Sequence, residues 1–194
     1  ADLRGADLRQ AELVETDLSG ANLREADLSR AYLWFATLSH ANLAGATLTG
    51  IEMGGVDLRQ SNLQRADLSQ ATLRRALSRI EFLPKFRPST VHWVDLFAAD
   101  LTEANLTGAD LRGADATTAI LIEANLGEAD LSGARLIEAD LSRADLSGAD
   151  LSKADLSGAD LGEADLTDAF VTDEQLAQAA SLKGAILPDG TVHE

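Results

Sequence analysis

The chain has 194 residues, no cysteine, and 32 acidic against 16 basic residues, which gives a formal net charge of −16. This charge argues against direct binding to DNA, RNA or an anionic membrane, because each needs a basic protein surface. The lack of cysteine excludes disulfides and thiolate metal sites. No apolar run reaches the roughly 20 residues of a membrane span and no signal sequence is visible, so we expect a cytoplasmic protein. The chain begins within a repeat and without methionine, so its natural start is expected upstream.

Residues 1–75 form a first repeat block of 15 consecutive pentapeptides with the pattern Ala-(Asp/Asn)-Leu-X-X. The third residue is Leu throughout, from Leu3 to Leu73, except for Met53. The 10 acidic and 8 basic residues of this block nearly cancel. The first block is therefore almost neutral.

Residues 76–93 interrupt both the period and the composition. The stretch ALSRIEFL could form two helical turns that Pro84 ends. Because the segment is so apolar, we expect it to pack on the repeats, against an outward aromatic group formed by Tyr32, Trp34 and Phe35. The alternative is a projecting loop that binds a partner. The aromatic group is itself a candidate interaction surface.

Residues 94–173 form a second block of 16 pentapeptides, with 18 acidic and only 4 basic residues. At Ala116 the central Leu is missing, so we expect a locally thin core. Four outward apolar residues form either a patch that the preceding segment covers or a contact surface: Phe97, Ile120, Ile122 and Ile137.

The two blocks are out of phase, because Leu73 and Leu96 are 23 residues apart, which is not a multiple of five. This shift and the contrast in charge suggest two repeat proteins joined end to end, by evolution or by engineering. We nevertheless expect the two blocks to form one continuous rod.

Residues 174–194 leave the repeat. The stretch TDEQLAQAASLKGA predicts a short helix that Thr172 or Asp173 caps and that Gly184 ends. A short extended piece with a Pro-Asp-Gly turn follows. We expect this region to cover the open end of the core, as terminal caps of solenoids do. The N-terminal end shows no such cap.

A period of five fits neither an α-helix nor a β-strand. In a helix each Leu would advance by about 140°, which spreads the apolar residues around the whole surface. In a strand, successive Leu would fall on alternate faces because five is odd. A coil that turns a corner after each short segment brings every Leu to one axis. The Ala two places earlier then faces inward as well, and must be small.

The motif Ala-(Asp/Asn)-Leu-X-X, in 31 near-perfect copies, resembles the pentapeptide repeat family. The resemblance implies an all-β fold: a right-handed parallel β-helix of square cross-section, with four pentapeptides per coil. About eight coils and a short helical C-terminal cap are expected. Residues 20 apart would then stack at roughly 4.8 Å.

This stacking predicts both the core and a charged surface. The predicted core includes five central leucines: Leu23, Leu43, Leu63, Leu131 and Leu151. Asp110, Asp130 and Asp150 would form a ladder of like charge on the outside, and this ladder is a second candidate interaction surface.

No catalytic, cofactor or metal site is predicted. His40, His92 and His193 lie far apart and lack metal-ligand spacing. Asn105 begins a glycosylation sequon, but it is also the second residue of a regular repeat. A β-helix filled by its own leucines leaves no cleft for a substrate.

The sequence therefore favours a non-enzymatic, rigid acidic rod that serves as an interaction scaffold or regulator for an unknown protein partner. The resemblance implies one alternative, a DNA mimic that binds DNA gyrase, as some members of this family do. A structural spacer without a partner is a third possibility. The rod is expected to be a monomer or an end-to-end dimer.

Overall fold

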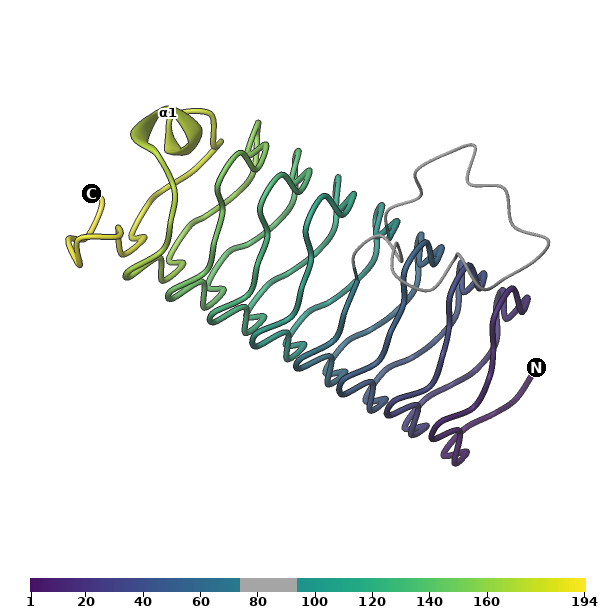
Figure 1. Ribbon diagram of the computed structural model, residues 1–194. Coiled ribbons are helices and arrows are strands. Elements are labelled where there is room, and N and C mark those ends of the chain that lie inside the picture. Colours follow the sequence, from purple (N-terminus) through teal and green to yellow (C-terminus); the bar gives the residue numbers. More distant parts are fainter. Residues whose placement is uncertain (74–93) are drawn as a thin grey trace, which may run out of the picture.

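The computed structural model describes residues 1–73 and 94–194. In this part the chain winds as a β-helix solenoid whose coils stack along one axis, with the two termini at opposite ends (Figure 1). Parallel β-bridges join residues 20 apart, such as Asp2 with Asn22 and Asp27 with Thr47. Four pentapeptides therefore make one coil. Each segment contributes one bridged residue, so the pairing consists of isolated bridges.

The bridged residues form four rows along the rod, and each residue is the second of its pentapeptide. We name the rows in the order of the first coil: row A begins at Asp2, row B at Asp7, row C at Glu12 and row D at Asp17. Neighbours within one row lie one coil apart. Each row therefore marks one face of the rod.

Backbone hydrogen bonds account for the five-residue period. The second residue donates its N–H to the preceding coil, while the third and fifth donate to the next coil. Asp145, for example, donates to the Ala124 carbonyl at 2.9 Å, and Leu146 donates to the Asp165 carbonyl at 2.7 Å. The first residue donates to the carbonyl of the preceding Leu and closes a turn. Only the N–H of the fourth residue has no backbone partner in this pattern.

The Asp or Asn at the second position accepts from that remaining N–H. The Oδ1 atom of Asp145 accepts from the Ser147 N–H at 2.9 Å, and that of Asn62 accepts from the Gln64 N–H at 3.0 Å. Such local bonds hold the backbone in an Asx turn. From the sequence pattern alone, these side chains were expected only to face the solvent. In the structure they also fix the geometry of the coil.

The turns between faces need a left-handed residue at the fifth position. Glu128 has φ 56° and Gly148 has φ 65°, and the other described fifth residues up to Asp168 are similar. With the bond from the following Ala to the Leu carbonyl, this is the pattern of a type II turn. Glycine adopts it without strain, whereas the other residues bear a steric cost.

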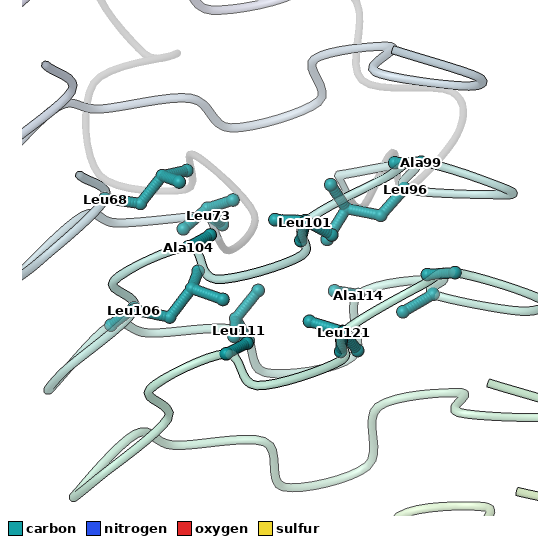
Figure 2. Close-up of a cluster of buried hydrophobic side chains, with 14 of the residues drawn as sticks. Leu68, Leu73, Leu96, Ala99, Leu101, Ala104, Leu106, Leu111, Ala114 and Leu121 are labelled. Atoms are coloured by element: carbon teal, nitrogen blue, oxygen red, sulfur yellow. The ribbon is translucent and has the colours of Figure 1, made fainter. Parts of the chain in front are cut away.

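The central leucines fill the axis of the rod. Leu23, Leu43, Leu63 and Leu151 are fully buried, and Leu131 is 3% exposed. Figure 2 shows leucine and alanine side chains of successive coils packed together in the interior. Beside Ala116 the described interior contains a cavity of about 10 Å³ that is lined only by Leu and Ala.

The two repeat blocks pair with each other through the same rows. Asp57 bridges Asp95, a separation of 38 residues, which is 18 more than in the regular pairs. Across this joint Arg65 donates to Glu103 at 2.9 Å. The bridges therefore continue from one block to the next without a change of register. The predicted packing of residues 76–93 lies outside the described residues.

The C-terminal helix is shorter than predicted. Helix α1 spans Asp173–Leu176, with Thr172 as its N-cap in a capping box with Gln175. Gly184, which was expected to end a longer helix, lies in a later turn with φ 74°. The intervening chain returns to the coil because rows A and B still offer unpaired backbone at this end. Ser181 accordingly bridges Asp160, and Ile186 bridges Asp165.

The side chain of Gln175 replaces the backbone of a further coil on row D. Its Nε2 atom donates to the carbonyl oxygens of Leu151 at 2.7 Å and Ala154 at 2.8 Å. Gln175 is buried, and its Oε1 atom accepts from the Thr172 N–H. The helix thus satisfies the carbonyl group of Ala154, which a following coil would otherwise pair.

The continuous register predicts that residues 76–93 can be removed. Their deletion joins Arg75 to Val94 and restores the pentapeptide phase. We expect one cooperative thermal transition and an unchanged β-type circular dichroism spectrum. Deletion of 76–92 is the matched control: it leaves one extra residue at the joint and should lower the Tm. Loss of cooperative unfolding in the 76–93 deletion would contradict the prediction.

The cavity beside Ala116 predicts a stabilising substitution. Ala116→Leu restores the central leucine of the repeat and fills the void, which should add about 1 kcal/mol to the free energy of unfolding. Urea denaturation measures this change. The control Ala124→Leu places the same side chain at a packed inward position and should destabilise the protein. Equal effects of the two substitutions would argue against a void at Ala116.

The Asx turns predict different effects of Asn and Ala at Asp150, whose Oδ1 accepts from the Ser152 N–H at 2.8 Å. Asp150→Ala should lose about 1 kcal/mol of stability at pH 7, whereas Asp150→Asn keeps a neutral acceptor and should lose less. Hydrogen bonds from Ser152 lower the pKa of Asp150.

The lowered pKa fixes the pH dependence of this contribution. The folded state binds the proton more weakly than the unfolded state does, so the stabilisation is complete above pH about 3.9 and fades as the pH falls through the lower folded pKa. The deficit of Asp150→Ala, measured by urea denaturation, should therefore shrink below pH 4. A deficit that grows on acidification would show that the sign is wrong.

Candidate interaction surface

The acidic ladder Asp110, Asp130 and Asp150 occupies successive positions of row C. It is partly neutralised, because Arg112 pairs with Asp110 at 2.7 Å and lies 3.3 Å from Asp130. Row C then ends at Phe170, whose side chain is 66% exposed. Asp150 is therefore the member of the ladder farthest from Arg112.

The aromatic group lies on the same face, in the first block. Tyr32 belongs to row C, and its ring meets that of Trp34 edge to face with centroids 6.2 Å apart. Trp34 is buried, with 8% of its surface exposed, while Tyr32 and Phe35 are half-buried. Two coils of row C separate Tyr32 from Asp110. The structure thus puts the two predicted sets on one face without bringing them together.

Arginine side chains connect carboxylates of successive coils. Arg59 donates to Asp57 at 2.6 Å and lies 3.6 Å from Asp95. The hydrogen bond from Arg59 lowers the pKa of Asp57, whereas burial raises the pKa of Asp95. These pairs are largely solvent-exposed, so each contributes little to stability. They do, however, reduce the free negative charge on the faces where they occur.

A second such cluster surrounds Arg143, which pairs with Glu123 at 2.9 Å and Glu163 at 3.3 Å. It forms one side of a shallow surface hollow on row A, which we call the row A hollow. Its lining includes the following residues: Ile122, Ser142, Asp160, Gly162, Glu163 and Lys183. Ile120, in row A itself, is 38% exposed.

Sequence analysis offered Ile120 and Ile122 either as part of a contact surface or as part of a patch that residues 76–93 cover, without placing them in a hollow. The sequence feature that could have identified this site is the residue at the second position of the repeat. Row A carries Asp or Asn there from Asp2 to Asp160, except at Ile120. The side chain that normally accepts from the fourth residue is therefore missing at this one place in the row.

The described residues show no metal-binding cluster. No group of three or more His, Asp or Glu side chains in residues 1–73 and 94–194 could hold a metal ion. The amide of Asn105 is engaged: it accepts from the Thr107 N–H at 3.1 Å and donates to Asp67 at 3.2 Å. Within the same ranges, no helix has the length and apolar character that a bilayer span requires.

Comparison with solved structures finds similar chains. HetL, a pentapeptide repeat protein involved in heterocyst differentiation regulation from Nostoc sp. strain PCC 7120, is 38% identical; the match covers all of this chain and 85% of HetL, with a TM-score of 0.38. Rfr23, a pentapeptide repeat protein from Cyanothece 51142, is 34% identical over 74% of this chain and 91% of its own, with a TM-score of 0.45.

QnrB1, a plasmid-mediated fluoroquinolone resistance protein, is 20% identical over 97% of this chain and 92% of its own, with a TM-score of 0.45. Because all three TM-scores lie below 0.5, we base no functional argument on these likenesses. Comparison with curated proteins gave no match.

The family assignment depends on the repeats themselves. The family model of pentapeptide repeats matches eight times, over residues 1–75 and 99–168 taken together. These ranges make up well over half of the chain and coincide with the coils described above. The chain therefore belongs to the pentapeptide repeat family.

Proposed function

We propose that the chain is a non-enzymatic interaction protein of the cytoplasm: a right-handed β-helical rod whose second block binds a basic surface of a partner protein. The first block and the C-terminal cap extend and close the rod. The filled axis supports this proposal, because substrate sites are usually concave and enclosed, and the row A hollow is shallow and open. Binding must then occur on the outer faces.

The charge per unit length carries the proposal. Residues 94–173 have 18 acidic and 4 basic residues, a net charge of −14, over four coils. At about 4.8 Å per coil, this is about one net charge per 1.4 Å of rod. Double-stranded DNA carries one charge per roughly 1.7 Å of its axis. The first block, with a net charge of −2 over a similar length, has only about one per 9 Å.

This match in charge density favours a second, narrower candidate function. A protein that normally binds DNA presents a basic groove, and a rod with the charge density of DNA can compete for that groove. The family resemblance makes a gyrase-like topoisomerase the partner to test first. The uneven charge bears against this candidate, since only half of the rod resembles DNA in this respect.

Asparagine substitutions can test the proposal without disturbing the fold, because Asn also forms the Asx turn. The acidic-block variant changes four residues to Asn: Asp140, Asp145, Asp160 and Asp165. The matched control changes four first-block residues to Asn: Asp7, Asp17, Asp27 and Asp67. We expect proteins retained from a cell extract by the immobilised wild type to bind the acidic-block variant at least tenfold more weakly. The control should retain them as the wild type does.

The wild type and the two variants also distinguish between the candidate functions. Inhibition of gyrase supercoiling at stoichiometric amounts, lost in the acidic-block variant, would support the DNA mimic. Specific partners without inhibition would support the general scaffold. If the wild type retains nothing, or if both variants behave alike, binding through the acidic block is ruled out and the structural spacer stands.

A further inference from the structure

Ile120 departs from the repeat in a way that costs stability. In row A, the side chains on either side of it, Asp100 and Asp140, accept from the N–H groups of Thr102 and Ser142 at 3.1 and 3.0 Å. Ile120 cannot accept, so in the described part of the chain the N–H of Ile122 has no side-chain partner. Ile120 also exposes 38% of its surface. A residue that breaks a local rule without a gain for the fold points to a function.

The row A hollow begins beside this irregularity. Its floor is the column of fourth residues Ile122, Ser142, Gly162 and Lys183, whose coils are joined by backbone bonds of 2.8–3.0 Å. Ser142 and Gly162 are the smallest members of this stretch, which makes the surface concave. A Cβ atom at Gly162 would lie 3.0 Å from Oδ1 of Asp160, so a larger residue there would have to displace this carboxylate slightly. The hollow therefore extends along the rod from an apolar end.

The two sides of the hollow differ in how far their carboxylates are paired with cations. On the side of the fifth residues, Arg143 is shared between Glu123 and Glu163. On the side of row A, Asp140 and Asp160 form no ion pair with another described residue. Lys183 adds one positive charge at the far end of the floor, so the carboxylates around the hollow outnumber its cations by four to two. An occupant therefore meets an apolar surface at Ile120 and an excess of carboxylates one and two coils further on.

We propose that the row A hollow binds an extended basic segment of the partner protein. One apolar side chain of the segment contacts Ile120 and Ile122, and its Lys or Arg side chains pair with Asp140 and Asp160. Charge complementarity identifies this occupant. The distance fits as well, since two coils span about 10 Å, which three residues of an extended chain cover. This inference rests on the proposed function and names the face on which binding occurs.

The test uses two nine-residue peptides of alternating Lys and Gly, one ending in Leu and the other in Ser, with binding measured by titration at low ionic strength. The wild type should bind the Leu peptide about tenfold more tightly, because one apolar side chain is buried. Ile120→Asn should abolish this preference. Because Asn restores the missing acceptor, the same substitution should raise the Tm by about 2–4 °C.

The matched control is Phe170→Asn, which removes an exposed apolar residue at the same repeat position on row C. It should keep the tenfold preference. Equal binding of both peptides by the wild type, or loss of the preference in Phe170→Asn, would overturn the assignment to the row A hollow and leave the proposed function in place. If neither peptide binds, the acidic-block proposal fails as well.

Discussion

Backbone hydrogen bonding between coils is the constraint from which the rest of this structure follows. Each pentapeptide gives one N–H to the coil before it, two to the coil after it and one to its own turn. The remaining N–H group, that of the fourth residue, has no backbone acceptor, and unpaired amides are costly in a folded protein. Asp or Asn two residues earlier satisfies it. The repeat thus contains one residue type for each requirement: Ala for the narrow interior, Asp or Asn for the amide, and Leu for the core.

This arrangement also explains why the protein can carry so much negative charge. The carboxylates of the Asp residues at the second position are present for a structural reason, because they accept from the fourth N–H of the repeat. Hydrogen bonds lower the pKa of several of them, including Asp17, Asp27 and Asp155, so they remain charged in the fold. Asn serves the same role without charge. The choice between Asp and Asn can therefore vary from block to block while the fold stays the same, which leaves the surface charge free for recognition.

Departures from the pattern have different physical consequences. At Arg135 the acceptor is lost, but an ion pair with Asp115 at 2.5 Å is gained. At Ala116 the loss is one of volume inside the rod. At Ile120 an acceptor and polar surface are lost, and 38% of the residue is exposed. For this reason Ile120, rather than the regular acidic ladder on row C, identifies the face on which we place recognition.

The sequence by itself determined a coiled chain with a leucine core, because with a strict period of five neither a helix nor a strand buries every leucine. The four-pentapeptide coil was implied by the resemblance to the pentapeptide repeat family. The sequence also determined the uneven charge of the two blocks. Several features were decided only by the tertiary structure, because they depend on contacts between coils. They include the partial neutralisation of Asp110 and Asp130 by Arg112. They also include the hydrogen bond from the fourth N–H of each repeat to Asp145 and its equivalents, and the single turn of α1. The helix stops at Leu176 because the open edge of rows A and B binds the following chain more favourably than a second helical turn would, and local propensity does not report such an edge.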